Sequence, residues 1–227
     1  TDDRIILIVE DDIADNVSNP NKGVIQVTIG GNNVYENVEI DYRMSSLKAK
    51  DILAILNGEK SESLPTVIES TENDNLFVFW SGHGVPGAMC WDEEPYAMTG
   101  DDLSTVFKDM NLKRRYRKLL MMVEACFSGG VMEQCEGIPG MLFITAANGD
   151  ETSKADVFNG EMKVWMSNRF TSTFIEQITD NKDVAMRDLY YRLFINTVGS
   201  HVMVYNAENY GNLYSANMSE FINSIVR

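Results

Sequence analysis

Two short apolar runs, each ending in a group of small residues, constrain the fold of this chain more than any other feature. The first is FVFWSGHG at 77–84 and the second is LLMMVEACFSGG at 119–130. Apolar runs of this length bounded by glycine are typical of strands buried on both faces of a parallel sheet. Parallel strands need crossover connections that cover the sheet, usually helices, so we expect an α/β protein.

Each run presents one reactive side chain shortly after its last bulky residue. His83 lies three positions after Trp80, and Cys126 lies three positions after Val123. In open α/β sheets, ligands bind outside the carboxyl ends of the strands. If the two strands are neighbours, about 4.8 Å apart, then His83 and Cys126 face each other at that edge as a Cys/His dyad.

A Cys/His dyad supplies the chemistry of a thiol hydrolase. The thiolate is the nucleophile, and histidine first takes the thiol proton and then protonates the leaving amine. The backbone N–H groups of Gly84 and Cys126 are the predicted oxyanion donors. An inert cysteine buried at a strand end is the alternative, but it leaves the matched offset of the two motifs unexplained.

The motifs SGHG at 81–84 and EACFSGG at 124–130 resemble those of the legumain-like cysteine peptidases. These are relatives of the caspases and include the catalytic subunit of the GPI transamidase. Further similar segments cover nearly the whole chain, at 4–16, 37–43, 56–59, 113–120, 145–153 and 200–206. The resemblance implies a caspase-like, three-layer α/β/α sandwich with a mostly parallel sheet. It also implies a cysteine endopeptidase that forms a thioester acyl-enzyme.

Three alternative functions remain at this point. A transpeptidase or transamidase uses the same acyl-enzyme, and the segments at 37–43, 56–59 and 113–120 look especially like the transamidase. A non-catalytic binding module on the same fold has no physical need for His83, Gly84 and Cys126 together. An N-terminal nucleophile, Thr1, is chemically feasible but leaves both motifs without a role.

The amino-acid composition and net charge limit the classes of molecule that this chain can be expected to bind. The 227 residues, 44% of them hydrophobic, suit a single domain over 1–227 with one substantial core. The net charge of −15 argues against nucleic acid and against an anionic membrane surface as partners. No stretch approaches about 18 uninterrupted apolar residues, so no membrane segment is predicted. The expected partner is a peptide or protein substrate.

The sequence shows no metal-binding pattern and contains three cysteines. No cluster of His, Cys, Asp and Glu has the spacing of a zinc site, so we predict a mechanism without metal or cofactor, and we expect a structural role for His201. Three cysteines are too few for a disulfide scaffold. Cys90 and Cys135 are expected as free thiols, with a bridge between them as the alternative. The resemblance favours an extracytoplasmic location, whether secreted, periplasmic or lysosome-like.

The family's sheet begins with a strand and a helix that precede the strand expected here at 4–10, and this sequence shows no counterpart of either. A sheet without that strand exposes long unpaired edges, which native proteins avoid. We therefore expect a second chain from the same precursor, separated by a cut before Thr1, as in a zymogen. A peptidase carries the chemistry for autocatalytic cleavage, and cleavage by another protease is the alternative route. A shortened chain is the alternative.

The specificity pocket departs from the legumain pattern. Phe127 stands where legumains carry a glutamate. Asn168 stands where legumains carry an aspartate in the second wall of the specificity pocket. Thr152 and Ser153 match the family's pocket hydroxyls. Because both departures remove charge, a preference for asparagine is not carried over. We expect a small or uncharged residue before the cut, and a basic residue as the second choice because Asp150 and Glu151 lie in the same loop.

Periodicity and turn residues predict the remaining elements. A hairpin is expected at 24–38 and a polar loop at 148–160. The other expected strands are at 4–10, 75–80, 88–91, 119–123, 141–146 and 201–205, and the expected helices are at 47–56, 101–110, 163–178 and 184–197.

Overall fold

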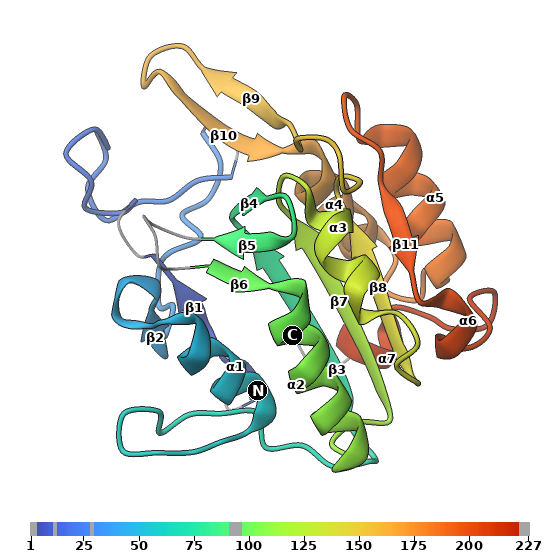
Figure 1. Ribbon diagram of the computed structural model, residues 1–227. Coiled ribbons are helices and arrows are strands. Elements are labelled where there is room, and N and C mark those ends of the chain that lie inside the picture. Colours follow the sequence, from blue (N-terminus) through green and yellow to red (C-terminus); the bar gives the residue numbers. More distant parts are fainter. Residues whose placement is uncertain (1–3, 11–12, 28–29, 91–96, 223–227) are drawn as a thin grey trace.

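The core of the protein is a four-stranded sheet that lies between two layers of helices (Figure 1). The computed structural model describes residues 4–10, 13–27, 30–90 and 97–222. The strand order is β11-β8-β7-β3. Three strands are parallel and the edge strand β11 is antiparallel; the bounds are β3 (Asn75–Ser81), β7 (Lys118–Glu124), β8 (Met141–Thr145) and β11 (Met203–Tyr205). The expected α/β/α sandwich with a mostly parallel sheet is confirmed.

Helices cover both faces of this sheet. One face carries α1 (Ala49–Asn57), α2 (Gly100–Leu112) and the short α3 (Ser128–Met132). The other carries α4 (Arg169–Asp180), α5 (Met186–Asn196), α6 (Ala207–Tyr210) and α7 (Ser219–Ile222). Within the described ranges, none of these helices has the length and apolar character needed to cross a bilayer.

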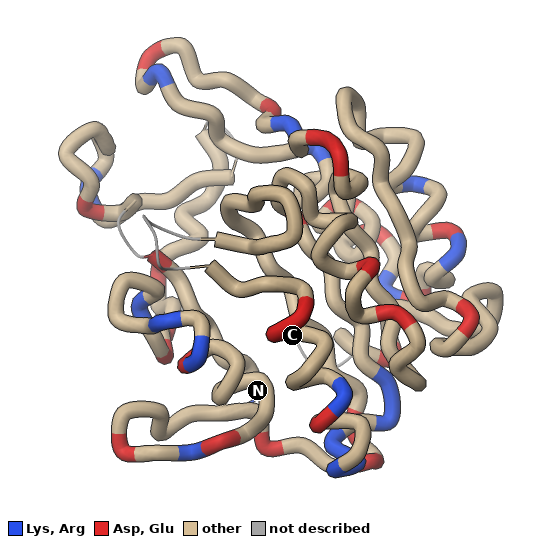
Figure 2. The backbone as a smooth tube through the Cα atoms, viewed as in Figure 1, with Lys and Arg blue, Asp and Glu red and all other residues tan. Residues whose placement is uncertain are grey.

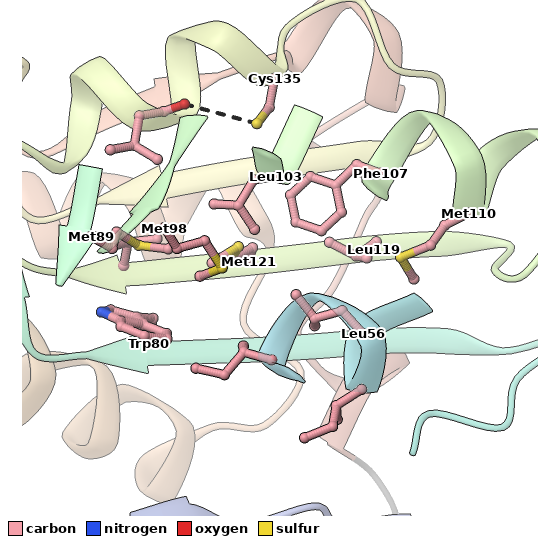
Figure 3. Close-up of a cluster of buried hydrophobic side chains, with 14 of the residues drawn as sticks. Leu56, Trp80, Met89, Met98, Leu103, Phe107, Met110, Leu119, Met121 and Cys135 are labelled. Atoms are coloured by element: carbon pink, nitrogen blue, oxygen red, sulfur yellow. Dashed lines mark hydrogen bonds between the residues drawn. The ribbon is translucent and has the colours of Figure 1, made fainter. Parts of the chain in front are cut away.

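The strand β7 serves both cores because its side chains alternate between the two faces. Leu119, Met121 and Val123 belong to the cluster under α1 and α2, whereas Leu120 and Met122 belong to the cluster under α4 and α5. All five are at most 1% exposed. Figure 3 shows the first cluster, in which side chains of α2 pack over those of β7. Burial on both faces explains why this strand is a continuous apolar run.

A small antiparallel sheet follows β3 and carries His83. It is formed by β4 (His83–Val85), β5 (Ala88–Cys90) and β6 (Ala97–Thr99), in that order. His83 pairs with Cys90 across β4 and β5. The strand predicted at 88–91 is therefore confirmed as far as Cys90, and Trp91 lies outside the described residues.

The helix α2 begins one residue earlier than predicted because of a reciprocal cap. The Thr99 hydroxyl accepts a hydrogen bond from the Asp102 N–H (3.2 Å), and the Asp102 carboxylate accepts one from the Thr99 N–H (3.0 Å). This arrangement is a capping box, with aspartate in place of the usual glutamate.

The basic run at 113–118 lies at the end of the sheet remote from β4, where Figure 2 shows a concentration of Lys and Arg. Three of its cations form ion pairs with nearby carboxylates; the pairs are Lys113–Asp109, Arg114–Glu72 and Lys118–Glu220. The run therefore has structural partners within the chain.

Two of the predicted elements are wrong, and a third is wrong at its start. The helix predicted at 163–178 begins only at Arg169, as α4, because residues 164–168 form a strand. Residues 24–27 and 30–38 form no strand, and Thr28 lies outside the described residues. The polar loop predicted at 148–160 contains β9 (Ala155–Asn159), which pairs with β10 (Val164–Asn168) in an antiparallel hairpin. Phe158 and Trp165 contact each other across this hairpin, with ring centroids 5.1 Å apart. The hairpin is largely exposed, so it lacks the apolar alternation that marks a half-buried strand.

One edge of the strand β3, which we call its free edge, pairs with no other strand in the part of the chain that the structure describes. Among the described residues its one strand neighbour is β7, and its apolar residues from Leu76 to Phe79 are only half-buried. The strand predicted at 4–10 is reduced to β1 (Ile8–Val9), which pairs with β2 (Tyr42–Arg43) in a separate two-stranded sheet. Figure 1 shows this pair on the side of β3 that faces away from β7.

Candidate active site

Cys126 lies in a sharp turn that leads from β7 into α3. We call residues 126–130, which include the start of α3, the cysteine turn. Phe127 caps α3 with a left-handed backbone conformation, φ 55°, which costs a residue other than glycine about 1–2 kcal/mol. Hydrogen bonds to the β8–β9 loop (residues 146–154) hold the turn. The Phe127 N–H donates to the Glu151 carbonyl (2.8 Å), and the Gly129 N–H donates to the Ala147 carbonyl (3.1 Å). The loop therefore fixes the turn that carries the thiol.

His83 reaches the same edge of the sheet through the pairing of β3 with β7. Ser81 at the end of β3 is in register with Glu124 at the end of β7, and the Gly82 N–H donates to the Glu124 carbonyl (3.1 Å). His83 and Cys126 both line one cavity of about 320 Å³. The cavity is lined by Ser81, Gly82, His83, Glu124, Cys126, Ser153, Lys154, Ala155 and Asn168.

Gly84 is required by close packing. A Cβ atom at this position would overlap the carbonyl oxygen of Cys126. The absence of a side chain therefore allows β4 to lie directly against the backbone of the cysteine turn. Gly84 is not among the described residues that line the cavity.

The specificity residues predicted from the sequence divide into two groups. Ser153 and Asn168 line the cavity, and the Ser153 hydroxyl lies 3.9 Å from the Cys126 sulfur. Phe127 and Thr152 are not among the described lining residues. The Thr152 hydroxyl instead accepts a hydrogen bond from the Lys154 ammonium (2.7 Å).

Glu124 is the main cavity residue that sequence reasoning missed. It is 4% exposed, and its Oε2 atom has no hydrogen-bond partner among the described residues. Burial raises the pKa of Glu124 to about 7, and a hydrogen bond with Ser153 offsets part of this effect. The available signal was a carboxylate at the end of an otherwise apolar strand. It lies two positions before Cys126, and residues two apart in an extended chain point to the same side.

Lys154 and Ala155 also line the cavity and were missed. They reach it because the β9–β10 hairpin begins beside the cysteine turn, and this hairpin was not predicted. The Lys154 ammonium donates to the Thr152 hydroxyl (2.7 Å), so its charge has a partner beside the cavity. With Glu124 partly protonated near neutral pH, the two side chains give the cavity a mixed polar character.

All three cysteines are free thiols, so the alternative Cys90–Cys135 bridge is not formed. Burial raises the pKa of Cys90, and the nearby Cys126 raises it further. Burial also raises the pKa of Cys135 to about 12, and its thiol donates to the Val131 carbonyl (Figure 3). Because the thiolate is the reactive form, Cys135 is chemically inert.

The remaining predictions from the sequence concern metals and other nucleophiles. Across the described ranges, no group of three or more His, Cys, Asp or Glu side chains is arranged to hold a metal ion. His201 pairs with Glu151, with 2.9 Å between Nδ1 and Oε2. Thr1 lies outside the described residues.

The fold and the cavity define a caspase-like α/β/α protein with a cysteine and a histidine at the carboxyl end of its sheet. The sequence model of the Peptidase C13 family matches residues 1–221, and the chain belongs to that family. The chain is 29% identical to "Legumain" of Rattus norvegicus, over 90% of this chain and 48% of the relative.

Two further relatives agree with this assignment. "Hemoglobinase" of Schistosoma mansoni is 31% identical over 96% of this chain and 51% of its own length. "Vacuolar-processing enzyme" of Vicia sativa is 35% identical over 67% of this chain and 31% of its own length. The chain spans about half the length of the legumain and hemoglobinase that it matches.

We expect the ionisation of Glu124 to destabilise the fold as the pH rises. The carboxyl pKa is about 7 in the folded protein against an ordinary 4.5, so the folded state binds more protons between these values. The stability contributed by the protonated form is complete below pH 4.5 and is lost as the pH rises through about 7. The total is on the order of 3 kcal/mol.

Urea unfolding of the wild type and of Glu124→Gln at about pH 5 and about pH 8 measures this contribution. Glutamine has the shape of the protonated carboxyl and does not titrate, so the variant should lose less stability than the wild type between the two pH values. An identical pH dependence in both proteins would show that Glu124 ionises without cost.

Proposed function

We propose that this chain is a cysteine endopeptidase domain in which Cys126 is the nucleophile and His83 is the general acid/base. The observation that carries the proposal is that both side chains line one cavity at the carboxyl ends of adjacent parallel strands. Membership of the Peptidase C13 family supports the same chemistry. A structural role for both residues would not require them to share a cavity.

The proposed reaction follows from the groups at this edge of the sheet. His83 takes the thiol proton, and the Cys126 thiolate attacks the carbonyl carbon of the scissile bond. The backbone N–H groups of Gly84 and Cys126 stabilise the oxyanion. His83 then protonates the leaving amine, which departs and leaves a thioester on Cys126. Water, deprotonated by His83, attacks the thioester and releases the acid and the free thiol.

The cavity supports a preference for a small or uncharged polar residue before the cut. Glu124 lines the cavity, and its protonated form, favoured by a pKa of about 7, can donate a hydrogen bond to a neutral side chain. The Ser153 hydroxyl adds a further polar contact. A basic side chain is the second choice, because the partly protonated Glu124 carboxyl offers it less than a full negative charge near neutral pH.

We also propose that a further strand completes the sheet at the free edge of β3. The support is the half-buried apolar surface of β3 and its single strand neighbour among the described residues. An exposed edge strand of this kind is a template for pairing with another segment. An N-terminal fragment of the same precursor is the proposed source, and it would also complete the specificity pocket.

The name of the Vicia sativa relative, a vacuolar-processing enzyme, supports a vacuole-like or lysosome-like compartment for this protein. An extracytoplasmic location of this type is our proposal, and fractionation of the source cells tests it.

Replacement of Cys126 or His83 should abolish peptidase activity. The substrate is first found with fluorogenic peptides varied at the residue before the cut. Cys126→Ser and His83→Ala should each lower kcat by about 10³-fold or more, because the two residues act as a unit. The matched control is Cys135→Ala, which removes a thiol from outside the cavity and should keep the wild-type kcat.

The same assay tests the metal-free mechanism. An alkylating thiol reagent should inactivate the enzyme, and EDTA should have no effect. Full turnover by Cys126→Ser, or activity that is lost with EDTA and restored with zinc, would rule out the proposed dyad mechanism.

Denaturing mass spectrometry of the active enzyme, purified from its source, tests the proposed additional strand. We expect a second polypeptide from the same precursor in the sample, because β3 then gains a hydrogen-bonded neighbour. A fully active sample that contains this chain alone would refute the two-chain proposal. It would leave the assignment of Cys126 and His83 intact.

A further inference from the structure

We propose that Glu151, held by His201, is a positioning residue that fixes the cysteine turn for catalysis. The inference rests on the proposed peptidase function, since it concerns how the proposed nucleophile is held. Neither residue is among the described residues that line the cavity. Their proposed effect on catalysis is therefore indirect and passes through the β8–β9 loop and the cysteine turn.

The Glu151 carboxylate is fully engaged in hydrogen bonds. Its Oε1 atom accepts from the His201 N–H (2.6 Å) and from the Asn148 N–H (3.1 Å). Its Oε2 atom lies 2.9 Å from Nδ1 of the His201 ring. The carboxylate thus joins the β8–β9 loop to the segment before β11, and it is not free to attract a basic substrate as the sequence suggested.

The pKa of Glu151 agrees with an ionised carboxylate in this position. Burial raises the pKa, but hydrogen bonds from the His201 ring, the His201 N–H and the Asn148 N–H outweigh burial and hold the pKa below its ordinary value. The charged form is therefore the one that the surrounding donors stabilise.

The backbone of the same residue holds the cysteine turn. The Glu151 carbonyl accepts the hydrogen bond of the Phe127 N–H (2.8 Å), directly after Cys126. Two positions later, Ser153 places its carbonyl oxygen 4.0 Å and its hydroxyl 3.9 Å from the Cys126 sulfur. A shift of Glu151 would therefore move one anchor of the turn, together with the Ser153 side chain that lies beside the sulfur.

Close packing makes the loop and the turn move together. A Cβ atom at Gly129 would overlap the backbone of Asn148, and one at Gly149 would lie 3.1 Å from the Cα atom of Gly130. These backbones are in contact without intervening side chains. Interfaces packed this closely transmit displacement, so an anchor on the loop is also an anchor on the turn.

The segment that supplies His201 is itself fixed to the loop. The Ser200 hydroxyl donates to the Ala146 carbonyl (2.7 Å) and is buried. A Cβ atom at Gly199 would lie 3.1 Å from Cγ of Lys154, so this side chain lies along the segment. His201 is consequently a rigid support for the carboxylate, although its own side chain is 69% exposed.

Kinetics of Glu151→Ala, His201→Ala and the double variant test the proposal. Each single variant should lower kcat about 10- to 100-fold, because misplacement of a catalytic group by about 1 Å has effects of this size. The double variant should lose no more than the worse single variant, since the two residues act as one unit. His201→Asn should restore much of kcat, because its amide nitrogen can replace Nδ1 as the donor.

The chain offers a closely matched control at the opposite end of β7. The Glu220 carboxylate accepts from the Asn217 N–H (3.0 Å) and pairs with Lys118 at 2.9 Å. Its side chain is 26% exposed, against 23% for Glu151. Glu220→Ala should therefore lower thermal stability about as much as Glu151→Ala, and it should leave kcat unchanged.

Amide hydrogen exchange at Phe127 provides a readout that does not depend on peptidase activity. We expect exchange about tenfold faster or more in both Glu151→Ala and His201→Ala, with no change in Glu220→Ala. Faster exchange in a protein that cleaves no peptide would support the positioning role and refute the proposed function. Unchanged exchange and kcat in the Glu151 and His201 variants, or an equal loss of kcat in Glu220→Ala, would overturn the positioning proposal.

Discussion

The parallel pairing of β3 with β7 is the constraint on which the rest of the structure depends. The two strands are in register over seven residue pairs, from Asn75–Lys118 to Ser81–Glu124. This register brings both carboxyl ends to the same level, so that the residues that follow, His83 and Cys126, enter one cavity. A slip of one residue would exchange the two faces of a strand between the cores, and burial of β7 on both faces makes that slip costly.

The site itself is built from backbone contacts that exclude side chains. Gly84 lies against the Cys126 carbonyl, and Gly129 and Gly130 lie against the loop that carries Ser153. The strained conformation of Phe127 persists because the loop accepts its N–H. In this arrangement the sheet sets the position of the thiol, and the β8–β9 loop sets its orientation.

Predictions from the sequence succeeded where burial leaves a pattern and failed where it does not. The strands before His83 and Cys126 were predictable because a continuous apolar run indicates a strand that is covered on both faces of the sheet. The β9–β10 hairpin was missed because its exposed strands show no alternation, and with it Lys154 was missed as a cavity residue. The hairpin predicted at 24–38 was wrong, because the described residues of that segment form no strand although Ile25, Val34 and Val38 line a cavity together with Leu7 and Val9. Glu124 was missed because its hydrogen bond with Ser153, 29 residues away in the chain, leaves no local pattern in the sequence.

The central claim, that Cys126 carries the acyl group during peptide cleavage, is tested most directly by trapping that intermediate. The enzyme is mixed with a cleavable peptide ester, quenched in acid within one turnover and mapped by mass spectrometry. We expect an acyl group on the peptide that contains Cys126, removable by hydroxylamine as a thioester and absent in His83→Ala. An acyl group on any other residue, or turnover with no acylated residue at all, would contradict it.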